Sequence, residues 1–313
     1  MTAVPSNSAV RVSLADLIAL RLRALRLARP AARVGGSHAA AHISRFRGRG
    51  VDYVESRAYQ PGDDIRQMDW RVTARTGRPH TKLFQEEREQ SVLLVVDDNP
   101  GLRFGTRVRF KSVQAARAAA LIAWAAVQGG DRIGALGFGP GLNAEVKPGG
   151  GPRGALRVLR ALAEWDAITA TGVEIVPLSQ ALRRAHRLAR PGSRVILLTD
   201  GFAADAAAEA PLTLLAEHCD VAALLLTDPL EQHAPPPARY ALRSESGQVL
   251  LDFAVARTRA RWPLLFAERR QGLIDMLKRH GLGWTLLDTA AEPEPALARL
   301  LGLDGRRNIA RPA

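Results

Sequence analysis

Residues 91–101 read Ser-Val-Leu-Leu-Val-Val-Asp-Asp-Asn-Pro-Gly, and this stretch decides the fold. Its apolar run is rich in β-branched residues and ends in two carboxylates, Asp97 and Asp98, after which Pro100 and Gly101 prevent the strand from continuing. The pattern predicts a buried parallel strand that ends in an acidic loop. Ligands of open α/β sheets bind beyond the carboxyl ends of the strands, so this loop is the first candidate site.

Strands and helices alternate along the chain after this stretch. Strand-like runs occupy 132–138, 194–199, 221–227 and 284–287, and helical patterns occupy 109–128, 155–165, 178–190, 212–217, 258–280 and 294–301. A Gly-rich segment, 139–154, is expected to be a loop, and 240–253 has the pattern of a β-hairpin. Helices of this length between strands require a sheet covered on both faces. We therefore predict an α/β fold with a doubly wound, mainly parallel sheet of the Rossmann type.

The chain divides into four predicted parts. These are an N-terminal helix with a flexible linker (1–42), a β-rich insertion (43–90), the α/β domain with a hairpin at 238–254 (91–303) and a tail (304–313). Ser13 can cap the first helix, and the apolar stripe of that helix is expected to pack on the protein's own core. The stripe consists of Leu14, Leu17, Ile18, Leu22 and Leu25.

Composition limits the class of protein. The net charge is +13, yet only four of the 44 basic residues are lysines (Lys82, Lys111, Lys147 and Lys278). The arginine excess fits either a GC-rich genome or an anionic partner, although aromatic residues make up only 5% and argue against nucleic acid. The single cysteine, Cys219, excludes an internal disulfide and fits a reducing cytosol. No apolar run reaches the roughly 18 residues that cross a bilayer.

Carboxylates follow three of the predicted strands: Asp97 with Asp98, then Asp200, then Asp228. In a parallel sheet these strand ends share one edge, so the carboxylates are expected to converge. Oxygen ligands from several loops suit a hard cation, Mg²⁺ before Ca²⁺.

This arrangement resembles the von Willebrand factor A fold, whose metal-ion-dependent adhesion site uses Asp-x-Ser-x-Ser, a Thr on a second loop and a later Asp. Asp97 matches the first Asp and Asp200 the last, whereas Asn99 and Gly101 stand where the two serines would be. No Thr stands in register. The resemblance implies a degenerate metal site formed by Asp97, Asn99 and Asp200, which would hold Mg²⁺ weakly.

A second motif lies in 59–75, which crowds acids, arginines and a tryptophan together. Pro61 and Gly62 predict a turn, and Asp63 or Asp64 can cap a short helix. The arginines Arg66, Arg71 and Arg75 can pair with Asp69 or with other carboxylates. The cluster either pins the segment to the main domain or binds a partner. The segment resembles the bacterial family called domain of unknown function 58, and the resemblance extends from about residue 50 to 301. The motif residues are Tyr59, Pro61, Gly62, Asp63, Arg66, Asp69 and Trp70, with Arg71 and Arg75 following.

The family resemblance implies a partner role. Members are commonly encoded beside MoxR-type AAA+ ATPases and other von Willebrand A proteins, and are thought to act with them in assembly or maturation of client proteins or in metal insertion. Many relatives carry two N-terminal membrane helices, which this sequence lacks, so we expect a cytoplasmic, chaperone-like adaptor. Its docking face is expected at the strand ends, around Asp97, Asp98, Asn99 and Asp200.

Enzymatic alternatives lack their residues, and we predict that the chain is not an enzyme. A phosphohydrolase of haloacid-dehalogenase type needs a second Asp two positions after the first, and position 99 is Asn. No Gly-Lys-Ser/Thr loop or Gly-x-Ser-x-Gly elbow is present. The remaining alternative is a basic surface that binds nucleic acid or an anionic membrane through 21–33 and 257–270. Peripheral contact with the inner face of the membrane would fit that alternative.

Overall fold

A computed structural model describes residues 7–27, 51–60, 64–86, 89–168, 174–244 and 247–303. The chain forms two compact units: Met1–Arg33 with Gln90–Ala313, and Val34–Glu89. The first is called the large unit below and the second the small unit.

The large unit is built on a six-stranded sheet with the order β10-β7-β6-β3-β4-β5. All neighbouring pairs are parallel except β4 and β5, which are antiparallel. This confirms the prediction of a mainly parallel α/β sheet. The strands are β3 (Ser91–Asp97), β4 (Arg132–Gly139), β5 (Leu142–Gly149), β6 (Arg194–Thr199), β7 (Asp220–Thr227) and β10 (Gly283–Asp288).

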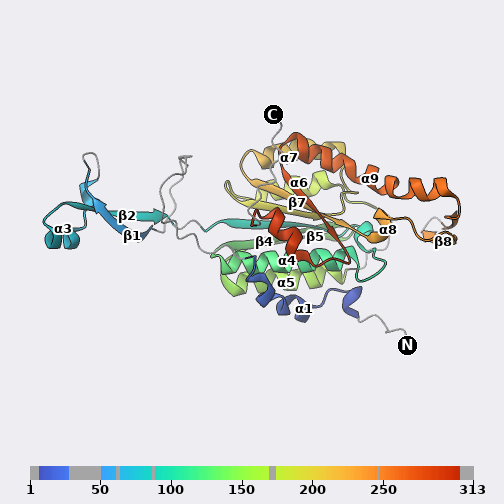
Figure 1. Ribbon diagram of the computed structural model, residues 1–313, viewed down its shortest axis with the longest axis horizontal. Coiled ribbons are helices and arrows are strands. Elements are labelled where there is room, and N and C mark those ends of the chain that lie inside the picture. Colours follow the sequence, from blue (N-terminus) through green and yellow to red (C-terminus); the bar gives the residue numbers. More distant parts are fainter. Residues whose placement is uncertain are drawn as a thin grey trace. The chain divides into compact units, whose positions relative to one another are not determined.

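Helices cover both faces of this sheet (Figure 1). Side chains alternate along β3, so that Val92, Leu94 and Val96 enter one core while Leu93 and Val95 enter the other. The first core contains residues of α1 (Leu14–Ala19), α2 (Arg21–Ala24), α4 (Lys111–Gln128), α5 (Gly151–Asp166) and α10 (Pro293–Leu300). The second contains residues of α6 (Leu178–Leu188), α7 (Glu209–Ala216) and α9 (Ala256–Arg279).

Two predictions about local structure were wrong. The Gly-rich segment 139–154 was expected to be a loop, but it contains the strand β5. Because β5 is at the edge of the sheet, the missing N–H of Pro148 costs no hydrogen bond to a neighbouring strand. The N-terminal helix does dock on the core, but through Leu17, Leu20, Ala24 and Leu27, while Leu22 is 76% exposed. The predicted stripe assumed one continuous helix, whereas the chain breaks at Leu20 between α1 and α2.

A hairpin, β8 (Arg239–Ser244) with β9 (Gly247–Asp252), lies at one end of α9 (Figure 1). A chain of ring contacts joins them, running from Tyr240 to Phe253, Trp262 and Phe266, and on to Phe202 in the loop after β6. The short α8 (Pro229–Gln232) follows β7. None of the helices within the described residues is long and apolar enough to span a membrane.

The small unit contains an antiparallel pair, β1 (Val51–Ala58) and β2 (His80–Glu86), within the segment predicted to be β-rich. Between them lie the 3₁₀ turn η2 (Ile65–Gln67) and α3 (Trp70–Thr76). The Asp64 side chain accepts a hydrogen bond from the Arg66 N–H and caps η2, as one of the two alternatives for that cap predicted.

Candidate functional site

Asp97 ends β3 at the carboxyl edge of the sheet, and its side chain is buried. Its Oδ1 accepts hydrogen bonds from the Asn99 N–H and the Asn99 Nδ2 at 2.9 and 2.7 Å, and its Oδ2 accepts one from the Thr199 hydroxyl at 2.6 Å. Burial, and then the negative charge of Asp200, raise the pKa of Asp97 to about 7. Burial and the neighbouring carboxylate thus both disfavour the charged form of Asp97.

Asn99 holds the loop before α6 against this strand end. Its Oδ1 accepts a hydrogen bond from the Val176 N–H at 2.8 Å, and its Nδ2 donates to the Val176 carbonyl at 3.1 Å. The Asn99 amide thus forms hydrogen bonds with both the N–H and the carbonyl of Val176. These bonds satisfy two backbone groups of a loop that lies at the edge of the sheet. Asn99 thus connects Asp97 to a segment 77 residues away.

Asp98 points into a separate ion-pair group. The Arg103 guanidinium donates to both carboxylate oxygens of Asp98, at 3.0 and 2.9 Å, and to Asp166 Oδ1 at 2.9 Å. Burial raises the pKa of Asp98 to about 6, although the charge of Arg103 opposes that shift. Asp98 and Asp97 are therefore adjacent in sequence but belong to different clusters.

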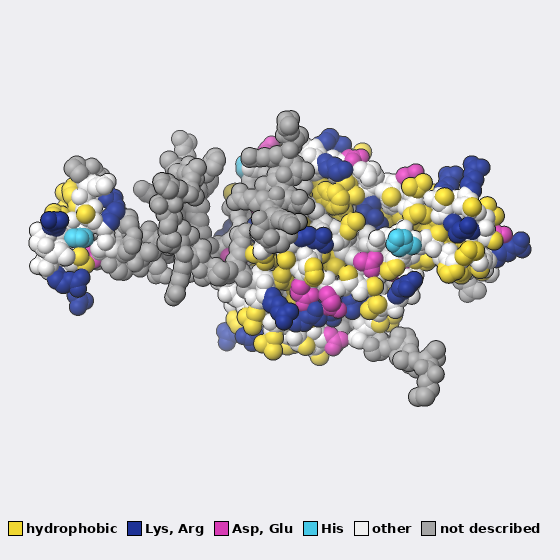
Figure 2. Space-filling view, viewed as in Figure 1, with side chains coloured by type: hydrophobic (Ala, Val, Ile, Leu, Met, Phe, Trp, Pro, Cys, Tyr) yellow, Lys and Arg dark blue, Asp and Glu magenta, His cyan; other side chains and the backbone are white. Residues whose placement is uncertain are grey.

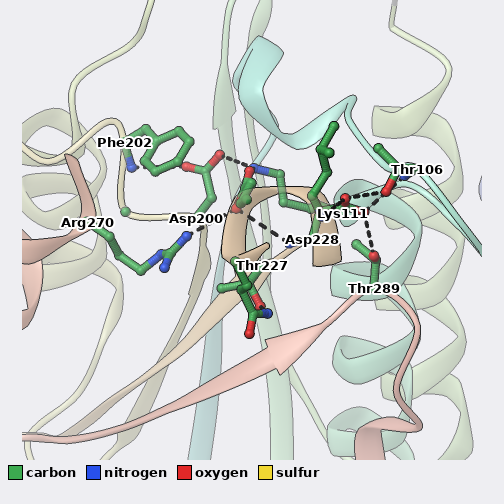
Figure 3. A network of polar contacts seen from close by, with 12 residues as sticks. Thr106, Lys111, Asp200, Phe202, Thr227, Asp228, Arg270 and Thr289 are labelled. Carbon is green, nitrogen blue, oxygen red and sulfur yellow. Dashed lines mark hydrogen bonds and ion pairs between the residues drawn. The ribbon is translucent and has the colours of Figure 1, made fainter. Parts of the chain in front are cut away.

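Lys111 lies at the centre of the strand-end carboxylates (Figure 3). Its side chain is 1% exposed, and its Nζ donates to Asp200 Oδ2 at 2.8 Å and to Glu231 Oε1 at 2.7 Å. The first helical residue of α4 thus brings a positive charge to the carboxylates that follow β6 and β7. Lys111 is the cation that neutralises Asp200 in this structure.

Arg270 and Phe202 complete this buried network. Arg270, on α9, donates to Glu231 Oε2 at 3.1 Å, so two carboxylates face two cations. The Lys111 ammonium also lies 4.8 Å from the centre of the Phe202 ring, a distance suited to a cation–π contact. Since buried charges are tolerated only when they are paired and hydrogen-bonded, the four charged groups depend on one another. We call Lys111, Asp200, Glu231 and Arg270 the buried network.

Asp228 joins three further segments beside this network (Figure 3). It accepts hydrogen bonds from the Thr106 N–H and hydroxyl, the Thr289 hydroxyl and the Leu230 N–H. Burial alone would raise the pKa of Asp228, but the hydrogen bonds from Thr106 and Thr289 outweigh it and hold the pKa below its ordinary value. Asp228 therefore fixes the loop before α4, the start of α8 and the end of β10 together.

The predicted metal residues are all close to the strand ends, but each has protein partners. Asp97 and Asn99 bond to each other, and Asp200 pairs with Lys111. A Cβ atom added at Gly101 would lie 2.7 Å from Asp200 Oδ2, so the serine of the adhesion-site pattern has no room there. Within the described residues no group of three or more His, Cys, Asp and Glu side chains is placed to hold a metal ion. Mg²⁺ binding stays a prediction.

The carboxylates cannot form the exposed docking face predicted from the sequence. Asp97, Asn99 and Asp200 are buried, and the Asp98 side chain is 12% exposed and paired with Arg103. The physical reason is that the loops after β3, β6 and β7 close over these groups through the hydrogen bonds just described.

The motif segment of the small unit separates into an inner and an outer part. Asp69 is buried, caps α3 through the N–H groups of Arg71 and Val72, and accepts a hydrogen bond from the Ser56 hydroxyl at 2.6 Å. Tyr59 lies half-buried at the end of β1, where its N–H donates to the Pro79 carbonyl. Trp70, in contrast, is 65% exposed. Pro61, Gly62 and Asp63 lie outside the described residues.

Of the two kinds of partner predicted for the arginines, Asp69 is not the one they use in the described part of the segment. Among the described residues, no ion pair joins Asp69 to Arg66, Arg71 or Arg75, and these three arginines are exposed. Asp69 uses its oxygens to cap α3 instead. The structure therefore assigns the acid of the motif a local structural role and leaves the tryptophan and the arginines at the surface.

Sequence reasoning missed Lys111, Glu231 and Arg270. Lys111 is 89 residues from Asp200 and 120 from Glu231, so no local pattern connects them. One signal was present: in a chain with 44 basic residues, Lys111 is one of only four lysines. The Lys111 ammonium is a compact point charge with three donors, and it bonds to both carboxylates while 1% exposed.

Comparisons with known proteins place these features in a family. Residues 55–272 match the family described as "Protein of unknown function DUF58". An uncharacterized protein of Mycobacterium tuberculosis and one of Mycobacterium bovis are each 34% identical to this chain over 216 residues, which cover 68% of this chain and 67% of the relative.

Two solved structures are similar to the chain. A conserved hypothetical protein BatB from Bacteroides thetaiotaomicron has a TM-score of 0.43 and 15% identity, covering 69% of this chain and 98% of that one. An uncharacterized membrane spanning protein from Vibrio fischeri has a TM-score of 0.24 and 14% identity, covering 70% of this chain and 98% of that one.

Proposed function

The chain belongs to the DUF58 family, and we propose that it is a non-catalytic, von Willebrand factor A-like adaptor that acts with a MoxR-type AAA+ ATPase. In this role it would work in the cytoplasm and present client proteins for assembly, maturation or metal insertion. ATP hydrolysis would be the work of the ATPase.

The observation that carries this proposal is the position of the Lys111 ammonium. At the edge where α/β domains bind ligands, Lys111 lies 2.8 Å from Asp200 and 2.7 Å from Glu231. An enzyme needs groups that change charge or position during a reaction, whereas these four charges balance and are fixed by packing. A closed, self-neutralised edge supports a scaffold that acts through its surface.

Binding of the purified ATPase tests the proposal. The full chain would be immobilised, and a purified MoxR-type ATPase from the same organism would be applied without nucleotide, with ADP and with a non-hydrolysable ATP analogue. We expect saturable binding in at least one nucleotide state and a changed rate of ATP hydrolysis when the chain is added. Failure to bind in all three states would contradict the adaptor role.

Charge attraction needs its own control, because the chain carries a net charge of +13. An unrelated basic protein such as lysozyme would be immobilised beside it, and both would be measured at about 0.15 M salt, where the Debye length is about 8 Å. Adaptor binding should exceed lysozyme binding at this salt concentration. Equal binding by the two proteins would show that only net charge is involved.

A second candidate is contact with an anionic membrane, which is supported by the outer end of α9 and the hairpin. Leu250 and Leu264 are 63% and 55% exposed, and Arg257 and Arg261 are exposed on the same helix as Leu264. Hydrophobic and basic side chains gather over this end of the large unit in Figure 2. Amphipathic basic surfaces of this kind bind acidic lipids.

Sedimentation with vesicles of phosphatidylglycerol and phosphatidylcholine tests this candidate. Leu250→Ser with Leu264→Ser should weaken binding, whereas Leu214→Ser, at an exposed leucine of α7, should not. Equal binding by all three proteins would reject the α9 end as a membrane surface.

A further inference from the structure

Within the small unit, one face of α3 is exposed although the helix is held firmly. Asp69 caps the first turn, and the His80 N–H donates to Thr73 Oγ1 at 3.0 Å. The Asp69 N–H donates to the His80 carbonyl at 2.7 Å, and Gly77, in the left-handed conformation, ends the helix. The backbone of α3 is thus fixed to β2 before any partner binds, which reduces the entropy lost on binding.

One face of this helix carries an aromatic and two arginine side chains. Positions 70 and 74 are one turn apart, as are 71 and 75, so these four residues share one side of the helix. Trp70, Arg71, Ala74 and Arg75 are all exposed, whereas Val72 and Thr73 point toward the inside of the unit. We call Trp70, Arg71, Ala74 and Arg75 the α3 face. Basic and hydrophobic side chains both reach the surface of the small unit in Figure 2.

Trp70 is a large aromatic side chain that the small unit leaves exposed. Of the five tryptophans in the chain it is the most exposed, since Trp124 and Trp165 are buried and Trp262 and Trp284 are partly buried. Tryptophan and arginine are the residues most enriched at the energetic centres of protein interfaces. A large apolar ring beside two cations fits an apolar pocket with carboxylates on its rim.

We propose that the α3 face is the docking surface of the adaptor: the Trp70 ring inserts into an apolar pocket of a protein partner, and carboxylates around that pocket pair with Arg71 and Arg75. This inference rests on the proposed adaptor function and names the surface that carries it. The buried carboxylates of the strand ends take no direct part in docking.

The charges favour a protein over a nucleic acid as the partner. Asp64 is exposed in the turn just before Ile65, and Ile65 is itself 62% exposed. The Asp64 carboxylate would repel a phosphate backbone. The exposed Ile65 side chain would add to the contact with an apolar pocket. Proteins that bind single-stranded nucleic acids stack several bases on several aromatic rings. The helix α3, residues 70–76, carries one aromatic ring, that of Trp70.

The main test compares the affinity of wild-type and variant full-length chains for the MoxR-type ATPase. Trp70→Ala should weaken binding about 30-fold, the loss typical of an interface hot spot. Arg71→Glu with Arg75→Glu should weaken it about ten-fold or more and reduce its salt dependence, since the charges at the rim would repel. The matched control is Arg153→Glu with Arg157→Glu, two exposed arginines with the same spacing on α5, which should change affinity by less than about two-fold.

Acrylamide quenching provides a readout on the tryptophan itself. In the free chain, Trp70→Ala should remove the most accessible part of the quenching, and addition of the ATPase should protect that part in the wild-type chain. If Trp70 is already shielded in the free chain, or if size-exclusion shows that Trp70→Ala dissociates a dimer, the α3 face is occupied by this chain itself and the proposal is overturned.

The outcomes separate the two proposals. If the wild-type chain binds the ATPase and both α3 variants bind equally well, the adaptor function stands and the α3 face is wrong. If the wild-type chain does not bind at all, the adaptor function fails and the α3 face fails with it. If the variants lose affinity for a DNA fragment but not for the ATPase, the face binds polyanions and the protein-docking proposal is overturned.

Discussion

The buried network and the α3 face use the same kinds of side chain in opposite ways. Each combines positive charges with an aromatic ring: Lys111 and Arg270 with Phe202 in the network, Arg71 and Arg75 with Trp70 on α3. In the network every charge has a partner within the chain and little is left for another molecule. On α3 the charges have no ion pair among the described residues. The comparison teaches that exposure and pairing, rather than residue type, separate structural from interacting groups.

Removing Lys111 should produce the largest effect. Lys111→Met leaves Asp200 and Glu231 buried without their shared cation, and we expect a loss of about 3–5 kcal/mol in the free energy of unfolding. Urea denaturation measures this, and Lys147→Met, at an exposed lysine, should change stability by less than about 0.5 kcal/mol. If Lys111→Met were as stable as the wild type, the buried network would not be needed for stability and would not differ from the α3 face in this respect.

A side chain at Gly101 should have the next largest effect. The added Cβ would lie 2.7 Å from Asp200 Oδ2, an oxygen that cannot move freely because Lys111 holds it. Gly101→Ser should therefore cost about 1–3 kcal/mol in the free energy of unfolding. The matched control is Gly150→Ser, where a Cβ meets nothing within 4 Å and a serine can cap α5. Gain of stability from Gly101→Ser would show that the loop accepts the adhesion-site serine.

The pH dependence of stability should reveal Asp97. Its pKa is raised to about 7 in the folded state, so the folded protein holds this proton more tightly than the unfolded chain does. The contribution of Asp97 to stability therefore falls as the pH rises from about 4 to about 7 and is constant above that range. The difference in unfolding free energy between wild type and Asp97→Asn should follow this curve.

The pKa of Asp228 is shifted in the opposite direction from that of Asp97, so its contribution to stability should depend on pH in the opposite sense. Because its folded pKa is lowered, its contribution to stability is present above its ordinary pKa and is lost as the pH falls below about 4. The difference between wild type and Asp228→Asn should therefore change in acid and stay flat between about pH 5 and 8. Parallel curves for the two variants would contradict these assignments.

The smallest effect on stability is expected at Trp70. Because its side chain is 65% exposed, Trp70→Ala should change the free energy of unfolding by less than about 0.5 kcal/mol, even though we expect it to weaken partner binding strongly. Thermal denaturation measures this. A large loss of stability would show that the ring is a structural part of the small unit and would remove the contrast with Lys111.

The sheet could be predicted from sequence because its signals are local. The apolar run of β3, its Asp-Asp-Asn-Pro-Gly ending and the alternation of strands with helices each lie within a short window. β5 was missed because an edge strand needs no apolar run on both faces and tolerates Gly and Pro. The family resemblance identified the motif residues, yet not which of them face outward.

The site was harder because its contacts are not local. That Asp97, Asn99 and Asp200 lie at one edge follows from parallel topology. That Lys111 reaches Asp200 and Glu231 depends on how the loop between β3 and α4 folds, which includes the close approach at Gly101. The burial of Asp69 and the exposure of Trp70, one residue apart, depend on where α3 begins.

The docking of the N-terminal helices has a consequence for the order of folding. The Leu17 carbonyl accepts a hydrogen bond from Trp124, and Arg23 pairs with Glu292 and Glu294, whereas the small unit, residues 34–89, separates these partners along the chain. During synthesis the early helices must wait for α4 and α5 before they can pack, and the ion pairs of Arg23 must wait until residues 292 and 294 have been added. Such distant pairing slows the closing step and leaves Leu17 and Leu20 uncovered on the nascent chain. The apolar side chains of the N-terminal helices therefore stay exposed to solvent until the domain closes.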